Sequence, residues 1–216
     1  MERTYLPAAG LDMFLPLYDT FTKFFGFDGV RRALLDQAAL QPRLRVLDIG
    51  CGTGTLAVLI KRLYPSVDVV GLDPDPKALA RARRKAERAG VAVQFDRGFS
   101  DALGYADGTF DRVFSSMMFH HLDEDDREPT LREVRRVLKP EGRLELLDFG
   151  GPDARAHGFL SHVIHPHAKL RGNASARILE LMVWAGFPAP RKVGEQDTLF
   201  GQAAFYQAGR QAATEP

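Results

Sequence analysis

The sequence predicts an α/β fold with a mainly parallel sheet, because short apolar runs alternate with longer stretches of helical periodicity over most of the chain. Many of the apolar runs end in Gly or Asp, as buried strands do before a turn. The chain has 216 residues, of which 45% are hydrophobic and 26% are charged, so it can bury the core of one ordinary domain.

The expected elements follow one another as strand, loop and helix. Asp75 is a candidate N-cap with Pro76 at the first helical position, and Gly90 marks the end of that helix. The acidic residues 123–126 suit the N-terminus of a later helix. Strands are expected at 44–49, 67–72, 91–95, 110–115, 143–149, 191–193 and 199–206, and helices at 56–64, 76–89, 126–139 and 175–185. The last two strands are expected to form an antiparallel hairpin.

Three segments organise the chain. Residues 1–43 are predicted to be a helical segment or lid that covers the sheet edge or the pocket, because Phe and Leu recur there at helical spacing. Residues 44–207 form the main domain, which includes a less regular cap region at 151–175. Residues 208–216 are polar and are expected to be a flexible tail. The aromatic and leucine positions of the first segment are Phe14, Leu17, Phe21, Phe24 and Phe25.

Composition excludes several classes of protein. The formal net charge is +1, whereas a dedicated nucleic-acid binder usually has a basic excess. The basic run at 81–88 is interpreted as the solvent face of a helix, with Ala82 and Ala86 facing the core. No apolar run approaches the roughly 18 residues that a membrane span needs, and the first residues do not resemble a secretory signal. With Cys51 as the single cysteine, we expect a protein of the reducing cytoplasm.

A glycine-rich loop, Gly50-Cys51-Gly52-Thr53-Gly54, follows the first expected strand. In open α/β sheets ligands bind at the carboxyl ends of strands, where glycines let the backbone approach and a helix N-terminus offers N–H groups. Asp73 closes the second strand about twenty residues later, as a carboxylate that accepts from ribose hydroxyls would. A dinucleotide site favours a small residue where Thr55 stands, so the loop fits a nucleoside with an amino-acid end better. The alternative is a glycine-rich turn that binds no ligand. It would give no reason for the carboxylate of Asp73 at the end of the second strand.

These segments resemble the class I S-adenosylmethionine-dependent methyltransferases, and their order is similar to that of the small-molecule subgroup that includes quinone-biosynthesis C-methyltransferases. The resemblance covers about residues 44–149 and rests on the motif at 48–54, on Asp73-Pro74, on the segment 107–111 and on the segment 136–142. It implies a Rossmann-like, seven-stranded, mostly parallel sheet with helices on both faces and a C-terminal antiparallel hairpin. It also implies S-adenosylmethionine as the cofactor.

The resemblance assigns roles to particular residues. Asp48 and the Gly50–Gly52 backbone would hold the methionine portion, while Asp73 would accept from the ribose hydroxyls. Phe99 and Ser100 stand where the family often has Asp-Ala, so that Phe99 would stack on the adenine instead. Tyr18 would close over the cofactor. The complete set of implied cofactor-binding residues is Tyr18, Asp48, Gly50, Cys51, Gly52, Asp73, Pro74, Phe99, Ser100 and Ser115.

The candidate catalytic residues are His120 and His121, which follow the fourth strand at the functional edge. An imidazole is a suitable general base near neutral pH, although methyl transfer by in-line displacement can rely on positioning alone. The alternative is that one of the pair only positions the next loop. Four further histidines at 157–167 are expected to belong to a cap, and no metal site is expected. The resemblance implies a small, partly apolar acceptor. The run 117–119 is open to two interpretations, an apolar substrate pocket or packing in the core.

Two other functions remain open at this level. One is an NAD(P)-dependent oxidoreductase, against which Thr55 speaks. The other is a non-catalytic S-adenosylmethionine-binding module that acts through partners. The partner expected for the enzyme is a small-molecule substrate, with no nucleic acid and no membrane span. The oligomeric state stays open, with a homodimer as one alternative.

Overall fold

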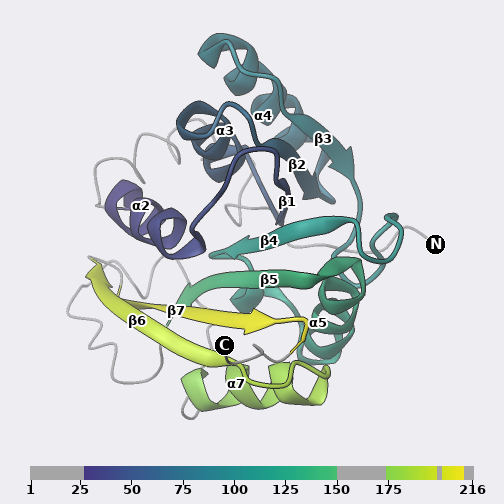
Figure 1. Cartoon of the computed structure of the whole chain (residues 1–216). Helices are drawn as coiled ribbons and strands as arrows, with labels where there is room; N and C mark the ends of the chain where they lie inside the picture. Colours follow the sequence, from purple (N-terminus) through teal and green to yellow (C-terminus); the bar gives the residue numbers. More distant parts are fainter. Residues whose placement is uncertain (1–26, 150–173, 199–200, 212–216) are drawn as a thin grey trace.

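The computed structural model describes residues 27–149, 174–198 and 201–211, and their strands form one sheet of seven in the order β3-β2-β1-β4-β5-β7-β6 (Figure 1). The first five strands are parallel, and β7 runs antiparallel to both β5 and β6. The sheet therefore reverses its order beside β1, between β1 and β4, which is where open α/β sheets bind ligands. The strands are β1 Arg45–Ile49, β2 Asp68–Asp73, β3 Gln94–Arg97, β4 Phe110–Ser116, β5 Leu138–Phe149, β6 Arg191–Thr198 and β7 Gly201–Gly209.

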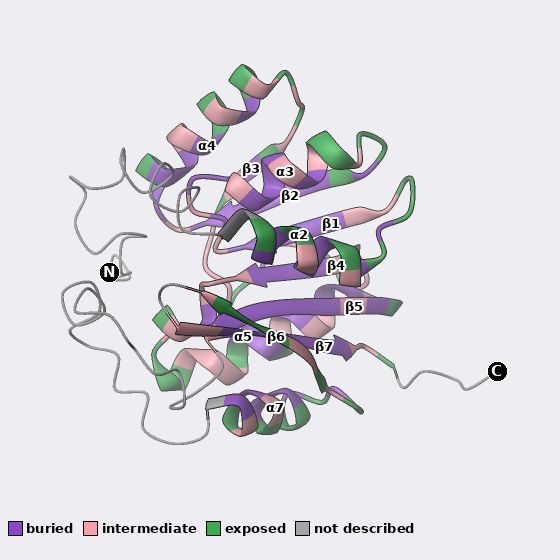
Figure 2. Cartoon of the chain, turned by 90° about the vertical axis from the view of Figure 1, so that its left-hand side faces the viewer, coloured by how far each residue is buried: buried purple, intermediate pink, exposed green. Residues whose placement is uncertain are grey.

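Helices cover both faces of the sheet. Helices α2 (Phe27–Ala38), α3 (Thr55–Leu63) and α4 (Pro76–Ala89) pack on one face in a cluster that includes Val46 and Phe114. Helices α5 (Glu124–Val137) and α7 (Ala174–Trp184) pack on the other face in a second cluster. Because neighbouring residues of a strand point to opposite faces and helices cover both, most residues of the central strands are buried (Figure 2). The expected fold class is confirmed.

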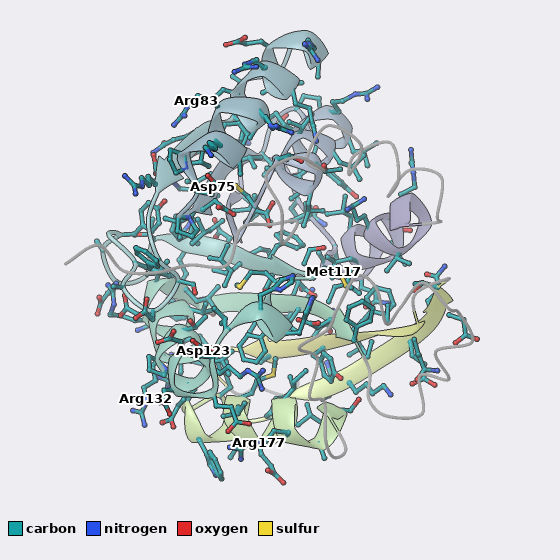
Figure 3. All side chains as sticks on the ribbon, turned by 180° about the vertical axis from the view of Figure 1, so that it is seen from behind. Asp75, Arg83, Met117, Asp123, Arg132 and Arg177 are labelled. Atoms are coloured by element: carbon teal, nitrogen blue, oxygen red, sulfur yellow. The ribbon has the colours of Figure 1, made fainter. Side chains whose placement is uncertain are left out.

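Helix α4 shows how local sequence sets an element. The Asp75 side chain accepts a hydrogen bond from the Lys77 N–H at 2.8 Å, and Gly90 ends the helix with a φ of 65°. Ala82 is buried against the sheet face, whereas Arg83 lies on the outer side of the molecule (Figure 3). The interpretation of this basic run as a largely solvated helix face is confirmed for its exposed members.

Several strand boundaries differ from the expectations. Strand β6 runs to Thr198 rather than to 193, because it pairs with β7 as far as Gly201. Strand β5 begins at Leu138 rather than at 143, because Leu138 already pairs with Phe110 ahead of a bulge. Strand β3 begins at Gln94 rather than at 91, because Val70 of β2 pairs first with Gln94. Strand β7 runs to Gly209, past the point where the tail was expected to begin, because it pairs with β5 from Phe149 back to Arg143. Further pairing with neighbouring strands extends β5, β6 and β7, whereas β3 begins later than expected because its pairing with β2 begins later.

A buried polar network fixes the C-terminal end of α2 to the sheet. The carbonyl oxygens of Gln37 and Ala38 accept hydrogen bonds from Arg112, Arg143 and Gln207 at 3.1–3.2 Å. These side chains surround Glu145 of β5, which is completely buried and accepts from Gln207 at 3.0 Å. They replace the capping that the last turn of α2 does not supply from its own sequence. No helix of the described residues has the length and apolar character that a membrane crossing requires.

Candidate active site

The loop after β1 carries three glycines in the left-handed region. Gly50, Gly52 and Gly54 have φ values of 63°, 52° and 74°, which cost a residue with a side chain far more than glycine. A Cβ on Gly50 would come within 2.1 Å of the Met118 Cγ, and one on Gly54 within 2.8 Å of the Ala82 Cβ. Both glycines are therefore required by the protein's own packing, and the loop opens directly onto the first turn of α3.

Asp73, at the end of β2, holds this loop in place. Its Oδ2 accepts a hydrogen bond from the Gly52 N–H at 2.8 Å, and its Oδ1 accepts from the Asp75 N–H at 2.9 Å. Burial raises the pKa of Asp73, and the two N–H donors oppose that shift only in part. The expected proximity of the Asp73 carboxylate and the glycine loop is thus present, with the carboxylate bound to the loop itself.

Asp48 has an unsatisfied oxygen. It lies in β1 next to the loop and is only 2% exposed, and its Oδ2 has no hydrogen-bond partner among the described residues. Burial raises the pKa of Asp48 to about 7, against the opposing charge of Arg31 on α2. The hydroxyl of Ser115, at the end of the neighbouring strand β4, is likewise buried with no partner in the described parts of the chain. Unsatisfied buried polar atoms are costly, so a polar ligand that reached either atom would be stabilised there. Because Ser115 pairs with Ile49, the residue after Asp48, the two side chains point to opposite faces of the sheet.

The segment after β4 also lies at the carboxyl edge of the sheet. It runs from Met117 to Asp123 at the N-terminus of α5, and Figure 3 labels both residues. Met117 has a φ of 56°, which is rare for a residue with a side chain, and its N–H donates to the Leu147 carbonyl at 2.8 Å. This sharp turn leads into the short helix η1 (Phe119–His121). It directs the two candidate catalytic histidines to the carboxyl edge of the sheet.

His120 is held by a buried carboxylate. Its Nδ1 lies 2.6 Å from Oδ1 of Asp148, a residue of β5 that is 1% exposed. Asp148 also accepts the His120 backbone N–H at 2.9 Å and the Phe149 N–H at 2.7 Å. Burial alone would raise the pKa of Asp148, but the charge and hydrogen bond of His120 and the two amides bring the pKa below its usual value. The imidazole is further flanked by the rings of His121 and Phe149, with centroids at 4.0 and 5.1 Å.

The other residues predicted for the cofactor site either follow the carboxyl ends of β1, β2 and β3 or lie outside the described residues. The carbonyl of Pro74 accepts from Arg97 at 3.1 Å, and the Ser100 hydroxyl lies 2.9 Å from that of Thr130 on α5. Phe99 is partly buried in the turn after β3. Cys51 is buried, and burial raises the pKa of its thiol. Tyr18 and the histidines at 157–167 lie outside the described residues.

Comparison with known proteins decides the family. A model described as "Methyltransferase domain" matches residues 46–142, which hold the loop, Asp73 and His120. The chain is 36% identical over 202 residues to the demethylmenaquinone methyltransferase of Thermus thermophilus, across 89% of this chain and 90% of that protein. It is 33% identical to the enzyme of the same name from Deinococcus radiodurans, across 89% and 83% of the two chains. This chain belongs to the class I S-adenosylmethionine-dependent methyltransferases.

Solved structures agree with this methyltransferase in fold. The YcgJ protein of Bacillus subtilis superposes with a TM-score of 0.68 at 21% identity, across 83% of this chain and 97% of that one. A SAM-dependent methyltransferase from Aquifex aeolicus gives a TM-score of 0.65 at 20% identity, across 82% and 88%. The methyltransferase uses S-adenosylmethionine, and the unsatisfied Asp48 Oδ2 beside the glycine loop fits the ammonium group of that cofactor.

Sequence reasoning missed two residues of the methyltransferase site. Asp148 stood inside an expected strand, and its position as the last residue but one of that strand was the one available signal. Lys85 was assigned to the solvated face of α4, yet its Nζ donates to the Thr53 and Thr55 hydroxyls at 3.0 and 2.7 Å. Within the described ranges, no group of three His, Cys, Asp or Glu residues could hold a metal ion.

Proposed function

We propose that this methyltransferase methylates a ring carbon of a small, partly apolar quinol, such as reduced demethylmenaquinone, by in-line displacement. The observation that carries the proposal is the 36% identity, over nearly the whole of both chains, to a demethylmenaquinone methyltransferase. The site is consistent with such an acceptor. Phe149 packs beside His120, and the partly buried Met117 and Met118 adjoin the same edge, so that apolar side chains surround a base.

The proposed cofactor contacts follow from the polar atoms at the strand ends. Asp48 binds the ammonium group, because a cation satisfies its buried oxygen and stabilises its charged form. Asp73 accepts from the ribose hydroxyls while it holds the Gly52 amide in place. Ser115 faces the space between cofactor and acceptor. When bound, S-adenosylmethionine supplies an activated methyl group, so the protein's task is to align the acceptor and exclude water. We further propose that Pro74, Phe99 and Ser100 contact the adenosine and that Tyr18 closes over the cofactor.

His120 is the proposed general base, and it removes a proton from the acceptor as the new bond forms. It lies at the carboxyl edge of β4 and is partly exposed there, whereas its partner Asp148 is buried. The His121 ring packs against the His120 ring at a tilt and is proposed to shape the acceptor pocket beside it. A well-placed base contributes on the order of 10²- to 10⁴-fold to the rate.

The proposal is tested by binding and turnover measured on the same preparation. We expect calorimetric titration to detect S-adenosylhomocysteine binding, and reduced demethylmenaquinone with a short side chain to give a methylated product by mass spectrometry. Asp73→Ala is expected to weaken S-adenosylhomocysteine binding by roughly 30-fold, because ribose hydrogen bonds to a charged group are lost and the loop is released. Asp68→Ala is the matched control, since Asp68 is exposed at the opposite end of the same strand.

The outcomes separate the parts of the proposal. If folded protein binds no S-adenosylhomocysteine, the assigned cofactor site is wrong. If it binds the nucleoside but methylates phenols, amines or thiols and leaves the quinol unchanged, the acceptor class is wrong. Equal affinities for the Asp73 and Asp68 variants would remove the ribose assignment alone.

A further inference from the structure

We propose that Asp148 is a positioning residue for methyl transfer, which holds His120 in the tautomer with the proton on Nδ1 and so makes Nε2 the basic atom. This inference rests on the proposed function of His120 as the base. It assigns to Asp148 a role that the sequence motif does not indicate, and it selects His120 rather than His121 as the residue that moves the proton.

The geometry of Asp148 leaves little freedom to the imidazole. One carboxylate oxygen lies 2.6 Å from the ring Nδ1, and the other accepts the backbone N–H of the same histidine at 2.9 Å. One side chain thus contacts both the ring and the backbone of His120 across the β4–β5 edge. The Phe149 N–H, at 2.7 Å from Oδ1, fixes the carboxylate in turn. Rotation of the ring would break the shortest of these three contacts.

The tautomer follows from the charge state of Asp148. Two backbone N–H groups and the neighbouring imidazole favour the ionised carboxylate despite its burial. An ionised carboxylate only accepts hydrogen bonds, so the Nδ1 facing it must carry the proton. In a neutral imidazole the lone pair then resides on Nε2.

The same pair stabilises the product of proton transfer. The acceptor bonds to the methyl carbon as the carbon–sulfur bond breaks, and its proton passes to Nε2. His120 thereby becomes an imidazolium beside an anion at 2.6 Å in a largely buried place, where charge attraction is strong. Among the described residues, the ring of His121 on η1 packs against the imidazole, and Tyr206 on β7 is close enough to feel the charge of Asp148. Neither bonds the Asp148 carboxylate, so Asp148 is the group that compensates the new charge.

A second carboxylate of β5 provides a matched control. Glu145 lies three residues earlier in the strand, is equally buried, and pairs with Arg143 and Gln207 in the network beneath α2. Replacing either carboxylate by its amide removes a buried charge from the same strand. Only Asp148 contacts a residue at the carboxyl edge of the sheet, so only its replacement should alter the chemistry.

The direct test reads the tautomer without turnover. In protein labelled with ¹⁵N-histidine and saturated with S-adenosylhomocysteine at pH 8, long-range ¹H–¹⁵N spectra distinguish the protonated ring nitrogen, and His120→Gln assigns the signals. We expect the Nδ1–H form in the wild type and in Glu145→Gln, and a shift toward the Nε2–H form in Asp148→Asn. An Nε2–H form in the wild type, or an unchanged spectrum in Asp148→Asn, would overturn the proposal.

The kinetic test uses reduced demethylmenaquinone. Asp148→Asn is expected to lower kcat by roughly 30- to 1,000-fold with KM for S-adenosylmethionine unchanged within twofold, and to move the acid limb of the pH–rate profile to lower pH. Added to His120→Gln, it should lower kcat by no more than a further twofold, because both changes remove one function. A kcat for Asp148→Asn equal to that of Glu145→Gln would mean that the carboxylate is only structural. If the quinol is not a substrate, the proposed function fails, whereas the spectra still decide the role of Asp148.

Discussion

Two buried aspartates, Asp48 and Asp148, lie near the carboxyl ends of parallel strands and differ in how they are satisfied. Asp48 in β1 has an oxygen with no partner among the described residues, and burial raises its pKa to about 7. Asp148 in β5 accepts three N–H groups, and its pKa falls below the usual value although it is as deeply buried. The chain itself satisfies the second carboxylate, whereas one oxygen of the first has no partner among the described residues.

The difference separates the two halves of the site. On the β1–β2 side, we propose that a bound ammonium group adds to the partial stabilisation that Arg31 gives the buried charge, so that its desolvation cost becomes selectivity for a cationic group. On the β4–β5 side the charge is already stabilised, so it can hold a second residue in one orientation. The following predictions contrast these two situations.

The largest expected effect is on cofactor affinity. Asp48→Asn should weaken S-adenosylhomocysteine binding by roughly 10- to 100-fold at pH 8, because a charge-assisted hydrogen bond is lost. Asp148→Asn should change the same affinity by less than twofold. Calorimetric titration of both variants measures the contrast, and similar losses in the two would show that the carboxylates do not act on separate halves.

The next effect is a proton linked to binding. Because Asp48 must be ionised to hold an ammonium group and its pKa is about 7, the dissociation constant should rise roughly tenfold from pH 8 to pH 6. Titrations near pH 6.5 in buffers of different ionisation enthalpy should show proton release on binding. Asp48→Asn should bind with nearly the same affinity at both pH values, and a pH dependence that survives this change would assign the proton to another group.

The two replacements Asp48→Asn and Asp148→Asn should change the thermal stability of the cofactor-free protein in opposite directions. The pKa of Asp48 rises on folding from 3.8 to about 7, so unfolding releases a proton between these values and the cofactor-free fold loses stability as pH rises toward 7. Above pH 7 Asp48→Asn should therefore raise the Tm by about 2–4 °C, equivalent to about 1 kcal/mol. Asp148→Asn should lower the Tm, since the amide cannot accept three N–H groups equally well. Thermal unfolding at pH 5 and pH 8 tests both signs, and a gain for Asp48→Asn that is larger at pH 5 would contradict the explanation.

The smallest expected effect concerns the outer side of the loop. Lys85 donates to the Thr53 and Thr55 hydroxyls and supports the turn between the glycine loop and α3. Lys85→Met should weaken S-adenosylhomocysteine binding by roughly two- to fivefold, because the loop keeps Asp73 as its main support. Arg84→Met on the exposed side of α4 is the matched control and should have no effect.

Much of the cofactor half could be predicted because its signals are local. The strand periodicity, the glycines and Asp73 occur within a single strand–helix–strand unit, and each depends on backbone preferences that a few neighbouring residues set. The acceptor half was predicted only as far as the histidines. Asp148 lies 28 residues from His120, and their contact requires β4 and β5 to be neighbours in register.

The amino-acid sequence by itself determined the fold class and the position of the glycine loop after β1, because periodicity and turn chemistry act over short distances along the chain. The tertiary structure decided where strands β3, β5 and β7 begin and end, which carboxylate is satisfied and which is not, and which histidine is held. These features depend on partners supplied by distant segments, since the pairing of a strand and the stability of a buried charge are set by whatever lies across from them.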